Sequence, residues 1–220
     1  MHLKIDETFA RLGMETHIGI LDYKIEVRST PPALLSALED GAEIRMQELM
    51  GEAASTDPVI AGVRSAFKAI GKDPSRYRPS SEALTRRILS GKGLYSVNNV
   101  VDCGNLVSLM TGVPVGCYDA AWLKGDTVAL RVGQPGETYE GIGRGDINLE
   151  CLPVLADKEG AFGTPFSDSA RTAVTENTHD LKFVLYGLNI DVAHVEAASE
   201  IADTLITRFC TLEEGEPPED

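Results

Sequence analysis

The order in which helix-like and strand-like patterns follow one another constrains the fold of this chain more than any other feature. Before the break at Gly112–Pro114, apolar residues recur mainly at three- and four-residue spacing, which is typical of amphipathic helices. From there to about Gly187, short strand-like runs alternate with glycine-rich connections. A block of helices followed by a block of strands predicts one domain of the α+β class.

Several of the expected elements have recognisable ends. Pro31–Pro32 opens one helical run, Asp57 followed by Pro58 opens the next, and Asp191 caps the last. We expect helices over residues 32–50, 58–70, 80–91 and 99–111 and after residue 191, and strands over residues 16–27, 127–132, 150–155 and 181–186.

The helix expected over residues 80–91 follows Pro79, which blocks an earlier start. Ser80 or Ser81 is expected to cap its free backbone donors. Glu82 and Arg86 are four residues apart, and we expect them to pair on the solvent face of the helix.

The simplest organisation is one domain with additions at its two ends. We expect residues 1–56 to form an N-terminal elaboration packed on the core and residues 57–211 to form the main domain. Residues 212–220 are expected to be a disordered acidic tail, because the run EEGEPPED has no apolar side chain to dock.

Charge and composition exclude several classes of function. The formal charge of -14 repels phosphates from most of the surface, so non-specific coating of nucleic acid is disfavoured and no DNA partner is expected. No apolar run approaches the length of a membrane span, and the first residues lack the layout of a secretion signal, so we expect a cytoplasmic protein without a membrane partner. The four cysteines contain no C-x-x-C pair and are expected to be buried free thiols, and no metal site or cofactor is expected.

Against this acidic background, residues 71–93 are basic. They hold six lysines and arginines and only two acids. Arginine presents several donors to phosphate oxygens, and Tyr77, between Arg76 and Arg78, can stack on a base. Two interpretations stay open: the segment meets an external anion such as RNA, or Arg76 or Arg86 is buried against Asp102 or Glu82.

Two further polar groups are candidates for a site. Asp102 and Asn105 lie one helical turn apart and can hold a polar ligand or orient local backbone. The polar run from Ser167 to Thr178 can line a pocket or form turns. The glycine-dense Gly141–Gly145 lies between short strand candidates and predicts a turn rather than a phosphate-binding loop.

Three blocks of the sequence together resemble a known family. They read DPSRYRPSSEALTRRILSGKGL, NNVVDCGNLVSLMTGVPVGCYD and SARTAVTENTHDLKFVLYGL. In this order they resemble the B3/B4 domain of the β subunit of bacterial phenylalanyl-tRNA synthetase and of free-standing relatives. The similarity covers about residues 59–190, and its most specific part is the pattern V-V-D-x-x-N-x-V-x-L-x-x-G-x-P from Val100 to Pro114. The block R-Y-R-P-S-S-E-A-L looks like the free-standing relatives.

The resemblance implies a fold and an activity. The fold would be α+β, with a mixed, mainly antiparallel sheet flanked by helices. In the synthetase this module hydrolyses the ester that links a mischarged amino acid to tRNA. By this resemblance the chain is expected to bind tRNA or aminoacyl-tRNA and to deacylate it in trans. Because an aminoacyl ester is already activated, positioning a water can supply much of the acceleration without a strong nucleophile.

One departure from the family pattern concerns the editing histidine. Where synthetase relatives read P-x-H-A-F-D, this chain reads Pro114–Asp119 with Gly116 in place of the histidine. Hydrolysis would then depend on other polar groups, for which Asn105, Thr172 and Thr175 are the candidates. The predicted substrate-binding or RNA-binding residues are Arg76, Tyr77, Arg78, Ser81, Glu82, Arg86, Asp102, Gly116, Asp119 and Arg171. The alternative function is a non-catalytic module that binds a free amino acid or related small molecule.

Overall fold

The computed structural model describes residues 1–211, so the predicted acidic tail, 212–220, lies outside the described residues. The helices are α1 (Glu7–Arg11), α2 (Pro32–Leu49), α3 (Pro58–Ala69), α4 (Ser80–Leu89), α5 (Asn99–Thr111) and α6 (Val192–Phe209), with 3₁₀ turns at Ala54–Thr56, Ala120–Trp122 and Ala170–Thr172. The strands are β1 (His2–Ile5), β2 (Thr16–Lys24), β3 (Val115–Asp119), β4 (Thr127–Val132), β5 (Thr138–Gly141), β6 (Gly145–Asn148), β7 (Pro153–Asp157), β8 (Gly160–Gly163) and β9 (Asp180–Leu188).

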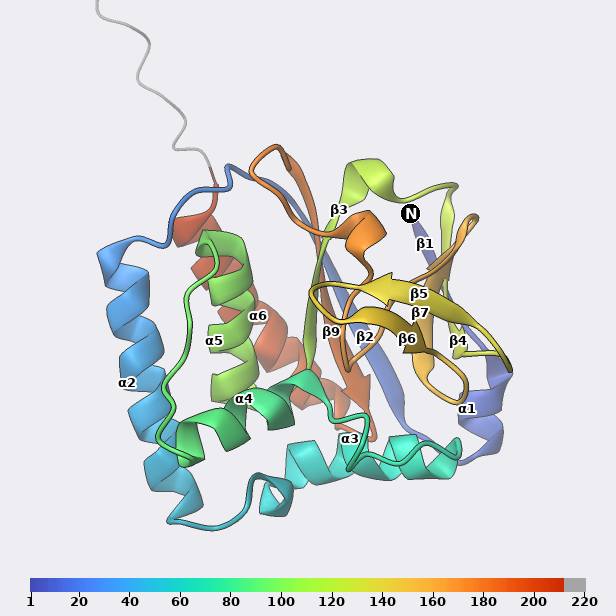
Figure 1. Cartoon of the computed structure of the whole chain (residues 1–220), viewed down its shortest axis with the longest axis horizontal. Helices are drawn as coiled ribbons and strands as arrows, with labels where there is room; N and C mark the ends of the chain where they lie inside the picture. The colour runs from blue at the N-terminus through green and yellow to red at the C-terminus, as the bar shows by residue number, and fades with distance from the viewer. Residues whose placement is uncertain (212–220) are drawn as a thin grey trace, which may run out of the picture.

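The strand β9 is the centre of the molecule. It pairs antiparallel with β2 on one side and with β3 on the other. Residues 181–188 are all buried, because both faces of this strand are covered. Helices α5 and α6 pack on one side of the β2-β9-β3 sheet, and α2 packs outside α5 (Figure 1).

A second sheet covers the other side of the first. Its strand order is β1-β4-β7-β8, with β1 parallel to β4 and the remaining pairs antiparallel. The ring of Tyr118 on β3 meets the ring of Phe162 on β8 edge to face, with 4.9 Å between centroids, so the core continues between the two sheets. These features confirm the predicted α+β class and the mixed, mainly antiparallel pairing with flanking helices.

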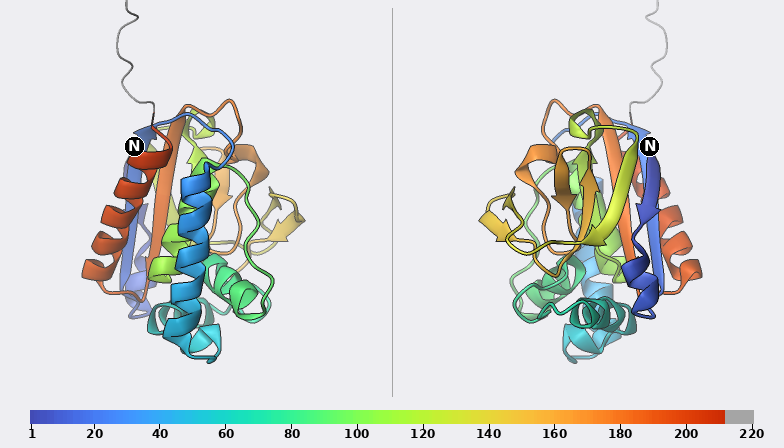
Figure 2. Two further views of the ribbon diagram at one scale, coloured as in Figure 1. Left: turned by 90° about the vertical axis from the view of Figure 1, so that its left-hand side faces the viewer. Right: turned by 90° about the vertical axis from the view of Figure 1, so that its right-hand side faces the viewer.

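The side of the molecule opposite α6, called the front below, is formed by shorter elements. Helix α4, the irregular segment 90–98 and the β5-β6 hairpin lie on this side, opposite α6 (Figure 2). Residues 142–144 form the turn of the hairpin, which confirms the turn predicted over Gly141–Gly145.

The expected helices and the longer strands are confirmed, with differences at their ends. The side chains of Asp57 and Asp191 cap α3 and α6 as predicted. The cap predicted for α4 is wrong: Pro79 occupies the N-cap position, and Ser80 and Ser81 lie inside the first turn without a side-chain cap bond. Strands β1, β3, β5, β6 and β8 were not individually expected.

The first 56 residues contribute a strand to each of the two larger sheets. His2–Ile5 pairs with Thr127–Leu130, and β2 pairs along its whole length with β9. The domain boundary at residue 57 stays a prediction. All four cysteines are free; Cys103 and Cys210 are buried, whereas Cys117 and Cys151 are only partly buried.

Candidate functional site

A pocket of about 330 Å³ opens on the front of the molecule between α4, α5 and the β5-β6 hairpin. Its walls are mostly apolar, which suits a small organic ligand. The lining residues are Ser80, Leu84, Tyr95, Val97, Val101, Gly104, Asn105, Ser108, Val115, Cys117, Ile142, Asp168, Ala173 and Val174.

Helix α5 supplies one wall, and Asp102 holds the neighbouring loop against it. Asp102 is fully buried, and its Oδ2 accepts hydrogen bonds from the hydroxyls of Thr30 and Ser96, both at 2.6 Å. Its Oδ1 accepts a longer bond of 3.4 Å from the amide nitrogen of Asn105. Asp102 therefore orients local structure, while Asn105 reaches the pocket.

Asp168 supplies the carboxylate of the pocket. The hydroxyl of Tyr118 donates to its Oδ1 at 2.6 Å, and the hydroxyls of Tyr118 and Tyr186 are 2.5 Å apart. Burial raises the pKa of Asp168 to about 7, and the bond from Tyr118 offsets part of that shift. Asp168 forms no ion pair with any cation of residues 1–211.

Two glycines leave the space that Tyr118 occupies. A Cβ on Gly116 would lie 2.2 Å from the hydroxyl oxygen of Tyr118, and a Cβ on Gly163 would lie 2.1 Å from it. Both distances are far below any real contact, so neither position accepts a side chain while Tyr118 keeps its place. Gly116 thus contributes to the site through the room it leaves.

Glu82 was expected on the solvent face of α4, paired with Arg86, and this is wrong. Its side chain is 1% exposed, and Arg64 on α3 donates to its Oε2 at 2.7 Å. Arg78 lies 3.5 Å from its Oε1. Spacing along α4 could not show this, because the closer partner comes from another helix. Arg86 is exposed and lies apart from this cluster.

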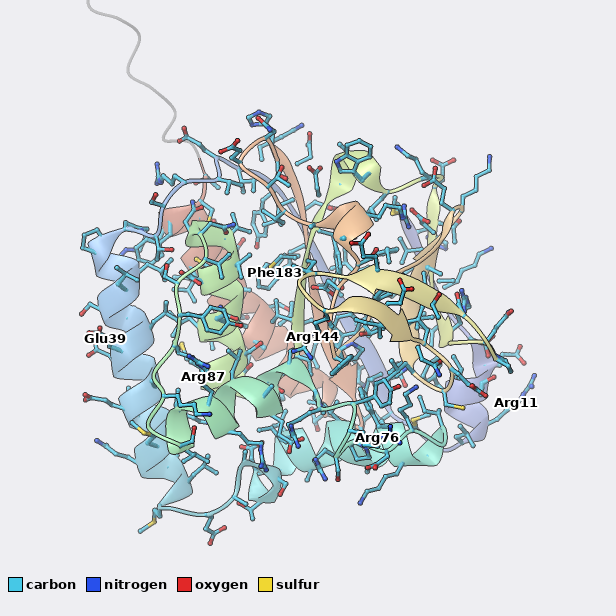
Figure 3. All side chains as sticks on the ribbon, in the orientation of Figure 1. Arg11, Glu39, Arg76, Arg87, Arg144 and Phe183 are labelled. Carbon is cyan, nitrogen blue, oxygen red and sulfur yellow. The ribbon has the colours of Figure 1, made fainter. Side chains whose placement is uncertain are left out.

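Several cations of the front are not neutralised by acids. Figure 3 shows Arg76, Arg87 and Arg144 on the side of the molecule that carries α4 and the β5-β6 hairpin. The Arg87 guanidinium stacks on Tyr95, a residue of the pocket wall, 5.0 Å from the ring centroid, and that of Arg144 lies 4.9 Å from the Phe166 ring. Within residues 1–211, no carboxylate forms an ion pair with these three arginines or with Arg86.

The other predicted binding residues of the basic segment have internal contacts. The ring of Tyr77 packs edge to face on Phe166 at 5.4 Å, and the Lys72 ammonium lies 3.8 Å from its centroid. Arg78 donates to the carbonyl oxygen of Ser75 at 3.0 Å. Ser81 is fully buried, and its hydroxyl has no partner among the described residues.

The remaining predicted residues lie outside the pocket lining. Thr172 is fully buried and its hydroxyl is 3.5 Å from the carbonyl oxygen of Phe162, whereas Thr175 is exposed. Asp119 accepts a 2.7 Å bond from the hydroxyl of Thr178, and Arg171 pairs with Asp157 at 3.0 Å. The pocket thus brings together Asn105 and the neighbourhood of Gly116, but not Thr172, Thr175, Asp119 or Arg171.

Asp168 and Tyr118 are site residues that the sequence reasoning did not single out. Asp168 belongs to the polar run from Ser167 to Thr178, where its residue type fits a turn as well as a pocket. Tyr118 stands where the resembling synthetases have phenylalanine, and its extra hydroxyl was the available signal.

Residues 1–211 contain neither a candidate membrane span nor a candidate metal-binding cluster. No helix in this part of the chain combines the length and apolar character needed to cross a bilayer. No group of three or more His, Cys, Asp or Glu side chains within the same residues is arranged to hold a metal ion.

Comparison with known proteins gives a consistent result. Residues 62–211 match the family model described as the B3/4 domain. Three similar proteins are phenylalanine–tRNA ligase beta subunits. The one from Protochlamydia amoebophila is 40% identical over 68 residues, which are 30% of this chain and 8% of that protein. For Symbiobacterium thermophilum the identity is 31% over 100 residues, covering 42% and 11%. For Bartonella quintana it is 26% over 148 residues, covering 56% and 18%. The chain therefore spans less than a fifth of the length of each of these relatives.

Proposed function

The chain belongs to the B3/4 domain family, and from this premise we propose that it binds tRNA and hydrolyses mischarged aminoacyl-tRNA in trans. The observation that carries the proposal is the pocket of about 330 Å³, with a carboxylate inside and unneutralised arginines on the same side of the molecule. A charged tRNA end offers phosphates to such arginines and an amino acid to such a pocket.

The pocket suits the side chain of an amino acid rather than a nucleotide alone. Leu84, Val101 and Val174 offer apolar contact, while Asn105 and Asp168 offer polar groups. An ester held between them needs only a well-placed water, because the aminoacyl bond is already activated.

The hydrolysis is tested by incubating the protein with a panel of mischarged tRNAs that includes Tyr-tRNA(Phe). We expect loss of at least one aminoacyl ester well above the rate in buffer. Equal rates with and without protein for every substrate would contradict the enzymatic part of the proposal.

RNA contact is tested separately by a salt titration of tRNA binding. The double variant Arg87→Ala/Arg144→Ala should bind tRNA more weakly. The negative slope of log K against log salt should become shallower by about 1.5, because two phosphate contacts are lost. Arg208→Ala is the matched control: Arg208 is exposed on α6, on the opposite side, and its loss should change neither value. An unchanged slope in the double variant would place the RNA elsewhere.

A second candidate is a binding module without catalysis, which would hold a free amino acid or related small molecule. Gly116 favours it, since this position has no side chain to serve as the histidine of the resembling synthetases. A ligand that binds only the folded chain raises its Tm by mass action, so a thermal-shift screen of amino acids tests it. Ester hydrolysis with no shift by any free amino acid would favour the first candidate.

A further inference from the structure

The space beside Gly116, where the resembling synthetases have a histidine side chain, is filled by the hydroxyl group of Tyr118. The hydroxyl oxygen of Tyr118 lies where a side chain at position 116 would begin, 2.2 Å from the position of its Cβ. The same oxygen would be 2.1 Å from a Cβ on Gly163. Two glycines on different sheets therefore make room for one hydroxyl.

This hydroxyl is directed at the pocket carboxylate. Tyr118 donates to Asp168 Oδ1 at 2.6 Å, and Tyr186 supports Tyr118 from the other side at 2.5 Å. Both tyrosines are fully buried, while Asp168 lines the pocket. The arrangement fixes the position of a carboxylate that has no ion-pair partner in residues 1–211.

We propose that Asp168 is the catalytic proton acceptor of the deacylation and that Tyr118 is its positioning residue, so that the two replace the histidine absent at Gly116. This inference rests on the proposed function and names the groups that perform it.

The reaction needs no reagent other than water. The water oxygen forms a bond to the ester carbonyl carbon while the Asp168 carboxylate takes its proton. The bond from that carbon to the ribose oxygen then breaks, and the ribose oxygen leaves with the proton returned from Asp168. Free amino acid and uncharged tRNA result, and Asp168 is again ionised.

Among residues 1–211, no other titratable group that faces Asp168 changes charge near neutral pH. The titratable groups that face it are Tyr118, Tyr139, Tyr186 and the Cys117 thiol. Burial raises the pKa of each of these four groups, so all of them stay neutral. The rate is therefore expected to rise with pH through about 7, following the pKa of Asp168.

The test compares three variants on whichever ester the wild-type protein hydrolyses, with rates measured from pH 5 to 8 and corrected for the buffer. Asp168→Asn should lower kcat by about 100-fold or more. Tyr118→Phe removes the bond that lowers the Asp168 pKa, so the midpoint of its pH profile should move upward. Tyr139→Phe is the matched control: its hydroxyl is also buried but donates to the carbonyl of Ser167, and the midpoint should stay. Near-UV circular dichroism checks that each variant is folded.

The outcomes separate this inference from the proposed function. Hydrolysis by a folded Asp168→Asn variant at the wild-type rate would overturn the inference and leave the proposed function standing. A slower Tyr118→Phe variant with an unmoved midpoint would show that Tyr118 only supports the fold. A wild-type protein that hydrolyses no ester would overturn both.

Discussion

Glu82 is fully buried and Asp168 is half-buried in the pocket wall, and the two carboxylates differ in the groups that surround them. Glu82 meets two guanidinium groups, Arg64 at 2.7 Å and Arg78 at 3.5 Å. Within residues 1–211 Asp168 forms no ion pair, and its side-chain hydrogen-bond partner is the neutral hydroxyl of Tyr118 at 2.6 Å.

The difference indicates a division of roles. A buried charge with matched partners stays ionised and ties elements together, here α3, the segment before α4 and α4 itself. Asp168 has no such cation among the described residues, and desolvation raises its pKa to about 7, a range where it can exchange protons at neutral pH. The first arrangement stabilises the wall of the pocket, and the second places inside it a carboxylate whose pKa lies near neutral pH.

The largest effect is expected when the paired carboxylate is neutralised. Glu82→Gln leaves Arg64 and Arg78 without their shared acid in a largely buried place, and it should cost about 3–5 kcal/mol in the free energy of unfolding. Denaturant unfolding measures this. A loss below about 1 kcal/mol would mean that the cluster is more hydrated than its geometry indicates and would remove the contrast with Asp168.

Neutralising Asp168, which has no ion-pair partner in residues 1–211, is expected to raise the free energy of unfolding, whereas neutralising Glu82 lowers it. Between about pH 4 and pH 7 Asp168 is protonated in the folded chain and ionised in the unfolded chain, so it lowers stability as the pH rises through that window. Asp168→Asn removes this penalty and should be more stable than wild type by about 2–4 kcal/mol at pH 8, with the difference vanishing near pH 4. Unfolding curves at the two pH values measure it, and a difference that is independent of pH would contradict the raised pKa.

A smaller effect is expected from filling the space beside the Tyr118–Asp168 pair. Gly116→Ala brings a methyl group into the Tyr118 ring and should cost about 1–3 kcal/mol, because the ring is enclosed and must shift. A thermal melt measures the loss. Wild-type stability in this variant would mean that Tyr118 moves freely, and the fixed geometry assigned to Asp168 would fail.

The smallest change in the free energy of unfolding is expected for an exposed ion pair, which serves as the reference for the buried one. Glu7 and Arg11 form an ion pair on α1 with side chains that are 80% and 72% exposed. Glu7→Gln should change the free energy of unfolding by less than about 0.5 kcal/mol, because water already solvates both charges. A larger loss by the same denaturant measurement would show that exposure is a poor guide to the value of ion pairs in this protein.

The sequence predicted the fold well where local chemistry sets the structure. Asp57 and Asp191 begin helices because their side chains accept from free backbone donors, and this depends on neighbours within three residues. Strand β3 was not expected, because Gly116 and Cys117 interrupt any apolar alternation. Its burial comes from pairing with β9, which lies more than 60 residues away.

The candidate site was less predictable, since it is assembled from separate segments. Asn105 was identified by its place in a specific pattern, and it does line the pocket. Asp168 was not singled out, because its unusual environment depends on Tyr118 and Tyr186, which come from two other strands. Thr172 was proposed from its residue type, but a hydroxyl in such a run can face inward, as this one does.

The carboxylate of Asp102 joins two parts of the chain that are far apart in sequence, Thr30 just before α2 and Ser96 in the loop over the pocket. A ligand large enough to push that loop outward must stretch the same junction from which α2 departs. Ligand binding in the pocket would then shift the N-terminal end of α2, a helix that does not contact the ligand. A fluorophore or spin label near residue 32 would detect that shift.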